Sequence, residues 1–240
     1  FKDNDENAEI ITAIDGVDLD VEEGQFIAIL GHNGSGKSSL AKHINALLAP
    51  TEGTVFLDGM DTKDQKLLWD IRQNAGMVFQ NPDNQIVATM VEEDVAFGPE
   101  NLKVPTAEIW KRVEKALGAV GMTKYRHKSP LKLSGGQKQR LCIARALLKK
   151  PKVLILDDST SAVDTHTDAM IRKAFIEEIP GTTKLIIAQR ISSVQDADRI
   201  IVMDGGKVVA FAPHDELMQT CDIYKEVFET QTKGGDFDEA

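Results

Sequence analysis

The pattern of apolar and polar positions separates buried strands from amphipathic helices along this chain. Two continuous apolar runs, GQFIAILG at 24–31 and KVLILD at 152–157, are typical of strands buried on both faces of a parallel sheet. Short alternations in residues 1–25 instead favour antiparallel strands with one face in water. Further strands are expected at 54–59, 74–82 and 182–188, and a hairpin at 198–212.

A helical period replaces the strand pattern in residues 83–150. The stretch 106–122 has apolar residues at every third or fourth position, which predicts an amphipathic helix. A second helix is expected at 135–151, where Pro151 would end it. A third, at 168–179, lies between two predicted strands, as a βαβ unit requires.

Strands that alternate with helices predict a single α/β domain. We expect its core to comprise residues 1–80 and 149–228, with an inserted α-helical subdomain at 81–148 and a loose polar tail at 229–240. The alternating N-terminal segments would add an antiparallel β subdomain.

Composition suits a domain of this size and excludes some partners. The chain has 240 residues, and 42% of them are hydrophobic, which is enough for one sizeable core. Its formal net charge of −10 argues against nucleic acid as a partner. Cys142 and Cys221 form no metal-binding pattern and are expected to be reduced thiols. There is no apolar run of about 18 residues and no signal peptide, and the start at Phe1 suggests a fragment.

The most specific motif is GHNGSGKSS at 31–39, which fits G-x-x-x-x-G-K-S/T between a predicted strand and a predicted helix. Its glycines let successive backbone N–H groups turn toward phosphate oxygens, and the helix adds its positive end. Lys37 would reach the β- and γ-phosphates of ATP, and the Ser38 hydroxyl would ligate Mg²⁺. The sequence therefore predicts a P-loop NTPase core. The residues expected to bind the nucleotide are Gly31, Asn33, Gly34, Ser35, Gly36, Lys37, Ser38 and Ser39.

Two adjacent aspartates end the apolar run VLILDD. A P-loop needs a second Mg²⁺ partner on a neighbouring strand, and Asp157 at the strand end supplies it. The metal does not require Asp158, so these residues alone leave the role of the second carboxylate open.

Five motifs follow one another along the chain: GHNGSGKSS, Gln80 in MVFQNP, LSGGQKQR at 133–140, VLILD and SAVD. With its motifs in this order, the chain resembles the ATP-binding-cassette (ABC) ATPases over nearly its whole length. In that family these segments are Walker A, the Q-loop, the signature, Walker B and the D-loop. The resemblance implies a RecA-like core and a transporter ATPase that uses ATP and Mg²⁺.

The resemblance also implies that two cassettes sandwich two ATP molecules head to tail. Each ATP would lie between the P-loop of one subunit and the signature of the other, where a helix N-terminus meets the γ-phosphate. Gln80 is expected near the metal with Ser38 and Asp157. The residues expected to contact ATP across the dimer are Ser134, Gly135, Gly136, Gln137 and Asp164.

Two positions depart from the family pattern where hydrolysis occurs. Most members have a glutamate after the Walker B aspartate and a histidine farther along, whereas this chain has Asp158 and Gln189. The shorter carboxylate would fall about 1.5 Å short, and misplacement of order 1 Å can cost roughly 100-fold in rate. Gln189 can donate a hydrogen bond but cannot share a proton as imidazole does. We expect catalysis by Asp158, Gln189 and Gln80 to be slow; a fully active variant is the alternative.

The resemblance changes character along the chain. Residues up to about 140, including FQNPDNQIVATMVEEDVAFGPENL, resemble the energy-coupling-factor ATPases of vitamin and metal-ion uptake. From about 141, segments such as RALLKKPKVLILDDSTSAVDTHTD resemble the degenerate-site cassette of heterodimeric multidrug exporters. This shift leads to the hypothesis of a recombined or engineered chimera joined near the signature helix.

The resemblance implies two kinds of partner: a second cassette, as a homodimer or heterodimer, and a transmembrane transporter subunit. Residues 81–98 would face that subunit, and their apolar side chains either contact it or belong to the helical subdomain core. Phe1, the one aromatic residue before Phe26, is a candidate for stacking on adenine. The expected location is cytoplasmic, peripheral to the inner face of the cell membrane.

These residues allow three functions to be compared. The first is an ATPase that powers a transporter. The second is an ATP-binding switch that dimerises with little turnover, or a chimeric cassette without a transport role of its own, which Asp158 and Gln189 favour. The third, a cassette protein of DNA repair or translation, normally needs a coiled-coil insertion or tandem cassettes, for which an acidic chain of 240 residues leaves no room.

Overall fold

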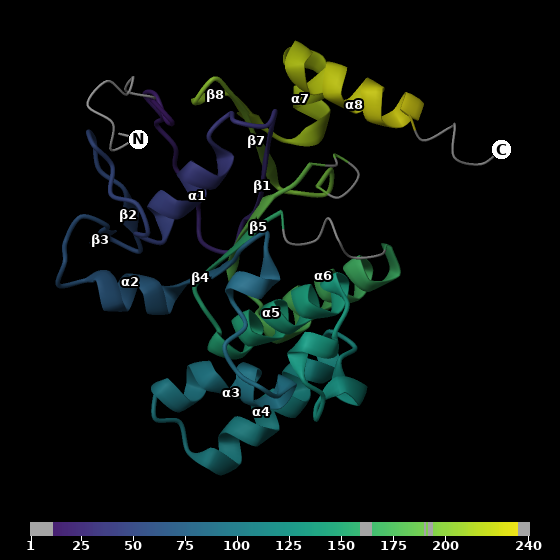
Figure 1. Cartoon of the computed structure of the whole chain (residues 1–240). Coiled ribbons are helices and arrows are strands. Elements are labelled where there is room, and N and C mark those ends of the chain that lie inside the picture. The colour runs from purple at the N-terminus through teal and green to yellow at the C-terminus, as the bar shows by residue number, and fades with distance from the viewer. Residues whose placement is uncertain (1–11, 159–164, 190, 192–193, 235–240) are drawn as a thin grey trace, which may run out of the picture.

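A twisted six-stranded sheet forms the centre of the computed structural model, which describes residues 12–158, 165–189, 191 and 194–234 (Figure 1). The strand order is β4-β5-β6-β1-β7-β8, and all neighbours are parallel except β7 and β8, which form an antiparallel hairpin. The strands are β1 (Phe26–Gly31), β4 (Ala75–Val78), β5 (Val153–Asp157), β6 (Thr183–Ile187), β7 (Arg199–Asp204) and β8 (Lys207–Ala212).

Strand β1 shows why a continuous apolar run forms a central strand. Ala28 and Leu30 pack into the large core cluster with the helices of one face, and Ile27 and Ile29 pack into a second cluster with α1 (Lys37–Ile44). Both faces of the strand are therefore excluded from solvent, so hydrophobic residues are needed at successive positions rather than at alternate ones.

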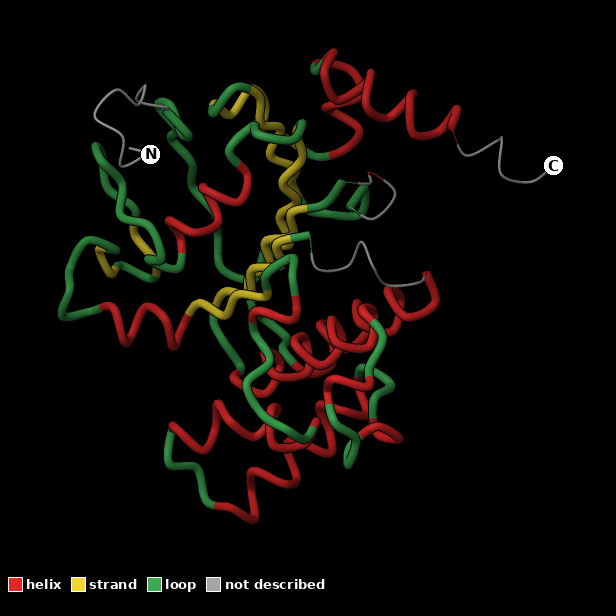
Figure 2. Tube along the Cα trace, in the orientation of Figure 1, coloured by secondary structure: helices red, strands yellow, loops and turns green. Residues whose placement is uncertain are grey.

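Helices cover both faces of the sheet, and a helical layer extends beyond one of them. Figure 2 shows the strands as a central column, with α1 and α2 (Leu68–Asn74) on one side and α5 (Gly135–Lys149) and α6 (Thr165–Glu178) on the other. Helices α3 (Val91–Asn101) and α4 (Thr106–Ala119) pack against α5. The chain ends with α7 (His214–Thr220) and α8 (Asp222–Gly234). Within the described ranges, no helix is both long and apolar enough to cross a membrane.

The α/β fold with a parallel sheet is confirmed, but the expected N-terminal antiparallel strands are not found in the described residues 12–25. Their alternation has another cause: Val17, Leu19 and Val21 lay their side chains on the core cluster beneath α1 without pairing as a strand. Antiparallel pairing outside the main sheet is between β2 (Phe56–Leu57) and β3 (Met60–Asp61).

The C-terminal segment also differs from expectation. Helix α8 continues to Gly234, beyond the point at which a loose tail was predicted to begin. Val227 and Phe228 pack against the main core cluster, and this burial holds the helix on the domain.

Candidate functional site

The predicted phosphate loop lies between β1 and α1 and has a tightly packed outer side. Gly36 caps the N-terminus of α1 with a φ of 98°, in the left-handed region. A Cβ atom there would lie 2.5 Å from the carbonyl oxygen of Ala13, and one on Gly31 would overlap the carbonyl oxygen of Met203. Glycine is therefore required at both positions, because neighbouring backbone passes directly behind the loop.

A backbone contact from the turn between β7 and β8, which the sequence did not predict, supports this loop. The N–H of Gly206, in the turn between β7 and β8, donates to the carbonyl of Ser35 at 3.2 Å. The carbonyl of Gly206 in turn accepts from the N–H of Asp15 at 2.9 Å. The pair Gly205-Gly206 predicted a turn, but nothing in the sequence indicated that this turn would touch a loop formed by residues 32–36.

Lys37 reaches back across the loop. Its Nζ donates to the carbonyl oxygens of Gly31 at 2.8 Å and His32 at 2.7 Å. Burial lowers the pKa of Lys37, and the negative charges of Asp157 and Asp158 partly offset that lowering. The ammonium group is thus close enough to both carboxylates to feel their charge, where it could also meet the terminal phosphates of a nucleotide.

The hydroxyl of Ser38 donates to Oδ1 of Asp157 at 2.9 Å. The two residues meet although β5 is not adjacent to β1: β6 lies between them, and α1 contacts β5 across it. A hydroxyl and a carboxylate side by side are the hard oxygen donors that Mg²⁺ prefers, and such sites usually take further oxygens from substrate phosphates. The described residues contain no cluster of three His, Cys, Asp or Glu side chains suited to a metal. Ser38 and Asp157 would therefore hold Mg²⁺ together with the nucleotide.

Asp158 is hydrogen-bonded to the other two predicted catalytic residues, Gln80 and Gln189. Its Oδ2 accepts hydrogen bonds from Nε2 of Gln80 at 3.2 Å and from Nε2 of Gln189 at 2.7 Å. Its backbone has a positive φ of 46°, and its N–H donates to the carbonyl of Ile187 at 3.1 Å. The carboxylate is buried, whereas both glutamines are exposed. Side chains from two distant segments thus converge on the Asp158 carboxylate, which follows Asp157 of the Ser38–Asp157 pair.

The signature segment forms the N-terminus of α5. Ser134 and Gln137 make a capping box: the Ser134 side chain accepts from the Gln137 N–H at 3.4 Å, and Gln137 Oε1 accepts from the Ser134 N–H at 3.0 Å. Side-chain Nε2 of Gln137 donates to the Tyr125 hydroxyl at 2.9 Å, a contact with no signal in the sequence. Ser134 and Gly135 are exposed, so this helix end is open to solvent.

Two of the predicted site residues, Phe1 and Asp164, lie outside the described residues. In the segment after Gln80, Ile86 packs against the main core, as one of the two interpretations expects, and Val87 is 61% exposed; contact of this segment with a transmembrane subunit stays a prediction. Gln80 as a metal ligand stays a prediction, because its amide nitrogen points to Asp158.

Residues 14–161 match the family model described as "ABC transporter". This chain belongs to the ABC transporter ATPases. Among its relatives, the chain is similar to the energy-coupling factor transporter ATP-binding protein EcfA1 of Caldanaerobacter subterraneus subsp. tengcongensis, with 54% identity over 215 residues. That alignment covers 88% of this chain and 77% of the relative.

Solved ABC structures share the fold. The chain is similar to cbiO1 from Clostridium perfringens, described as part of the ABC transporter complex cbiONQ, with a TM-score of 0.78 and 34% identity over 95% of this chain and 92% of that one. It is also similar to a dimeric post-hydrolysis state of an ATP-binding cassette bound to ADP and Pi, with a TM-score of 0.79 and 33% identity, covering 88% of this chain and 94% of that one. The chain is thus an ATPase domain homologous to cassettes that hydrolyse ATP.

The comparisons give no support to a chimera with an exporter-like C-terminal part. Because 215 residues of a chain of 240 align with EcfA1, the alignment includes most of the residues before position 140 and most of those after it. Asp158 and Gln189 therefore lie in a chain that aligns with EcfA1 over 88% of its length.

Proposed function

We propose that this chain is the ATP-hydrolysing subunit of an energy-coupling-factor-type ABC transporter and that closure of two cassettes around Mg-ATP drives a transmembrane partner. The contact of Ser38 with Asp157, directly beside the glycine-rich loop, is the observation that carries the proposal. The similarity to EcfA1 and to cbiO1 supports the energy-coupling-factor type.

The chemistry assigned to the site divides among its side chains. Backbone N–H groups of residues 31–39 and the N-terminus of α1 would bind the phosphates, and the Lys37 ammonium would neutralise charge on the β- and γ-phosphates. Bound Mg²⁺ would neutralise further phosphate charge. Asp158 would accept a hydrogen bond from the attacking water, oriented by Gln80 and Gln189, which already donate to it.

A second copy or a related cassette would complete the site. The exposed, capped N-terminus of α5 at Ser134 and Gly135 supports this part of the proposal, because its free N–H groups suit a γ-phosphate presented by another subunit. Residues 1–80 and 149–228 would form the nucleotide-binding core, and 81–148 the helical subdomain that contacts the transmembrane partner. That partner would hold the cassette at the inner face of the membrane.

We further propose that hydrolysis at this site is slow. An aspartate in place of glutamate withdraws the carboxylate by about 1.5 Å, a misplacement of the order that costs roughly 100-fold. The amides of Gln80 and Gln189 also occupy Oδ2 of this carboxylate with hydrogen bonds, so an attacking water would compete with them for the same oxygen.

Calorimetric titration of the folded chain with Mg-ATP tests the nucleotide site. The expected result is one site per chain, with affinity reduced at least about tenfold in Lys37→Ala because a charge-assisted phosphate contact is lost. Substituting Lys66, an exposed lysine away from the loop, is the matched control and should leave affinity unchanged. Absence of heat with the parent chain, or an equal affinity in Lys37→Ala, would overturn the proposal.

A further inference from the structure

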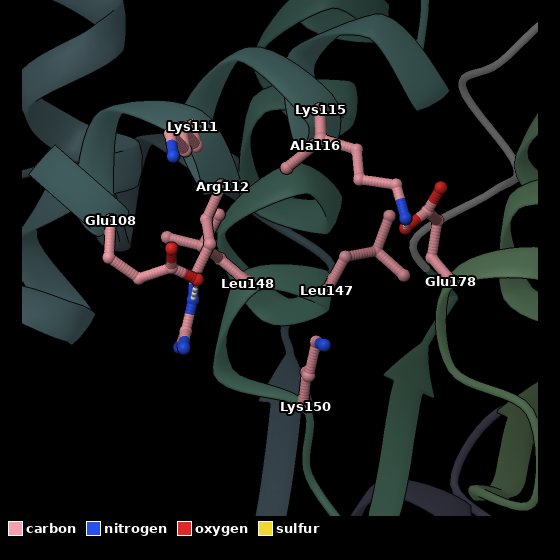
Figure 3. Close-up of a pocket in the computed structure, with 9 residues that line it drawn as sticks. All are labelled: Glu108, Lys111, Arg112, Lys115, Ala116, Leu147, Leu148, Lys150 and Glu178. Carbon is pink, nitrogen blue, oxygen red and sulfur yellow. Dashed lines mark hydrogen bonds and ion pairs between the residues drawn. The ribbon is translucent and has the colours of Figure 1, made fainter. Parts of the chain in front are cut away.

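A hollow of about 250 Å³ lies where the end of α5 meets α4 and the end of α6 (Figure 3). Ala116, Leu147 and Leu148, which are all buried, form its apolar lining. The volume lies just below the roughly 300–1,000 Å³ of sites for drug-sized ligands, so a smaller molecule would fit.

Charged side chains surround this lining. Four cations, Lys111, Arg112, Lys115 and Lys150, face two carboxylates, Glu108 and Glu178. Four positive and two negative charges leave a formal excess of +2, on a chain whose net charge is −10. The hollow therefore carries local charge opposite in sign to the protein as a whole, which favours an anion.

Ion pairs occupy only some of these cations. Arg112 pairs with Glu108 at 2.8 Å and Lys115 with Glu178 at 2.7 Å, at the two ends of the hollow in Figure 3. Lys111 and Lys150 form no ion pair with any residue that the structure describes. Two ammonium groups thus remain available to a ligand.

Lys150 is placed by an unusual backbone conformation. It ends α5 with a φ of 47°, in the left-handed region that glycine normally fills at a helix C-terminus. The pKa of Glu108 is lowered chiefly by the hydrogen bond from Arg112, and the charges of Lys111 and Lys150 lower it further. Both ammonium groups therefore act on the same small region from α4 and from the end of α5.

From this geometry we infer that the hollow binds a small phosphate ester with a short carbon skeleton, between Lys111 and Lys150 and against the two leucines. Ammonium groups pair with phosphate oxygens by charge-assisted hydrogen bonds, and the leucines would cover the carbon atoms. The same chemistry is offered by free glycerol phosphate and by the headgroup of phosphatidylglycerol.

The site is separate from the nucleotide site and independent of the proposed function. Lys150 precedes β5 and Asp157 ends it, and five strand residues span about 17 Å. Helix α5, of 15 residues, similarly places the hollow about 22 Å from the signature glycines.

Binding is tested in a Lys37→Ala background, so that the phosphate loop does not contribute. One arm titrates sn-glycerol 3-phosphate by calorimetry, and the other sediments the protein with phosphatidylglycerol or phosphatidylcholine vesicles. We expect binding in at least one arm, selective for anionic vesicles in the second, and weaker at high salt. Binding of the free ester alone identifies a soluble ligand, and binding of anionic vesicles alone identifies a lipid headgroup.

The variant Lys111→Gln with Lys150→Gln should weaken that binding about tenfold or more, because both unpaired cations are lost. Lys66→Gln removes an exposed lysine elsewhere and should leave it unchanged. Thermal melting by circular dichroism checks that the variants fold. If neither probe binds, or if the double variant binds as well as its parent, the inference is wrong.

Discussion

The side-chain amide of Gln231, on α8, donates a hydrogen bond to the main-chain carbonyl of Gln189 at 2.7 Å. Oε1 of Gln231 also accepts from the N–H of Ile191 at 2.8 Å. Gln189 in turn donates its side-chain amide to Asp158. The C-terminal helix therefore holds the backbone that carries a glutamine to the buried carboxylate.

Replacing Gln231 by alanine should slow phosphate release about tenfold while Mg-ATP affinity stays within about twofold. Two hydrogen bonds worth about 1 kcal/mol each are lost from the segment that orients Gln189, and the phosphate loop is left intact. Steady-state phosphate release and calorimetry measure the two effects. Thr230→Ala, which removes a hydrogen bond to Glu226 within α8 itself, is the control. An equal slowing in both variants would show that α8 acts only through stability.

Restoring the usual family residues, with Asp158→Glu and Gln189→His together, should raise phosphate release by up to about 100-fold. The longer carboxylate reaches the attacking water, and the imidazole can share a proton. Asp158→Asn keeps the shape without the negative charge and should fall below the parent rate. Equal rates in the parent and the double variant would defeat the proposal of slow hydrolysis.

The packing behind the phosphate loop predicts unequal effects of two alanine substitutions. Gly36→Ala should abolish nucleotide binding, because its Cβ would meet the Ala13 carbonyl at 2.5 Å. At Gly34, whose φ of 82° is also positive, no atom lies within 4 Å of an added Cβ, so alanine costs only about 1 kcal/mol of backbone strain. Calorimetry with Mg-ATP compares the two, and similar losses would contradict the geometry.

Asp94 is predicted to be a large contributor to stability. Its side chain is fully buried, with Oδ1 accepting from the N–H groups of Val87 at 2.8 Å and Ala88 at 3.2 Å and Oδ2 lying 3.4 Å from Arg145. Asp94→Ala should lower the free energy of unfolding by about 3–5 kcal/mol, because it leaves a charge and two N–H groups unpaired. Glu108→Ala breaks an exposed, solvent-screened pair and should change the free energy of unfolding far less than Asp94→Ala does. Urea denaturation measures both changes.

Cys142 should make stability fall at alkaline pH. Burial raises the pKa of its thiol from 9.0 to about 12. Between these values the unfolded thiol loses its proton while the folded one keeps it, so the contribution is complete below pH 9 and declines as the pH rises toward 12. Urea denaturation from pH 8 to 11 should show a shallower decline in Cys142→Ala than in Cys221→Ala, its buried counterpart. Identical declines would count against this assignment.

Features that depend on short stretches of sequence could be predicted well. The strand β1, the glycine loop and the start of α1 follow one another within residues 26–37, and α5 begins at Gly135, where the helical period predicted it. The family motifs added the expectation that Gln80, Asp158 and Gln189 share one site. The structure places them together, although the sequence separates them widely.

Other features needed the tertiary structure, because they arise where distant segments meet. Residues 17–21 alternate as a strand does, but strand pairing depends on a free neighbouring edge, and here the side chains of Val17, Leu19 and Val21 pack on the core instead. The support of Ser35 by Gly206, the anchoring of Gln189 by Gln231 and the cations gathered around Leu147 have no local pattern. Hydrophobic periodicity and turn residues act over a few positions, so the sequence by itself determined most of the helices, the strands and the phosphate-loop motif. Strand order and helix packing decided which of those elements touch, because burial of the shared core selects one arrangement for the whole chain.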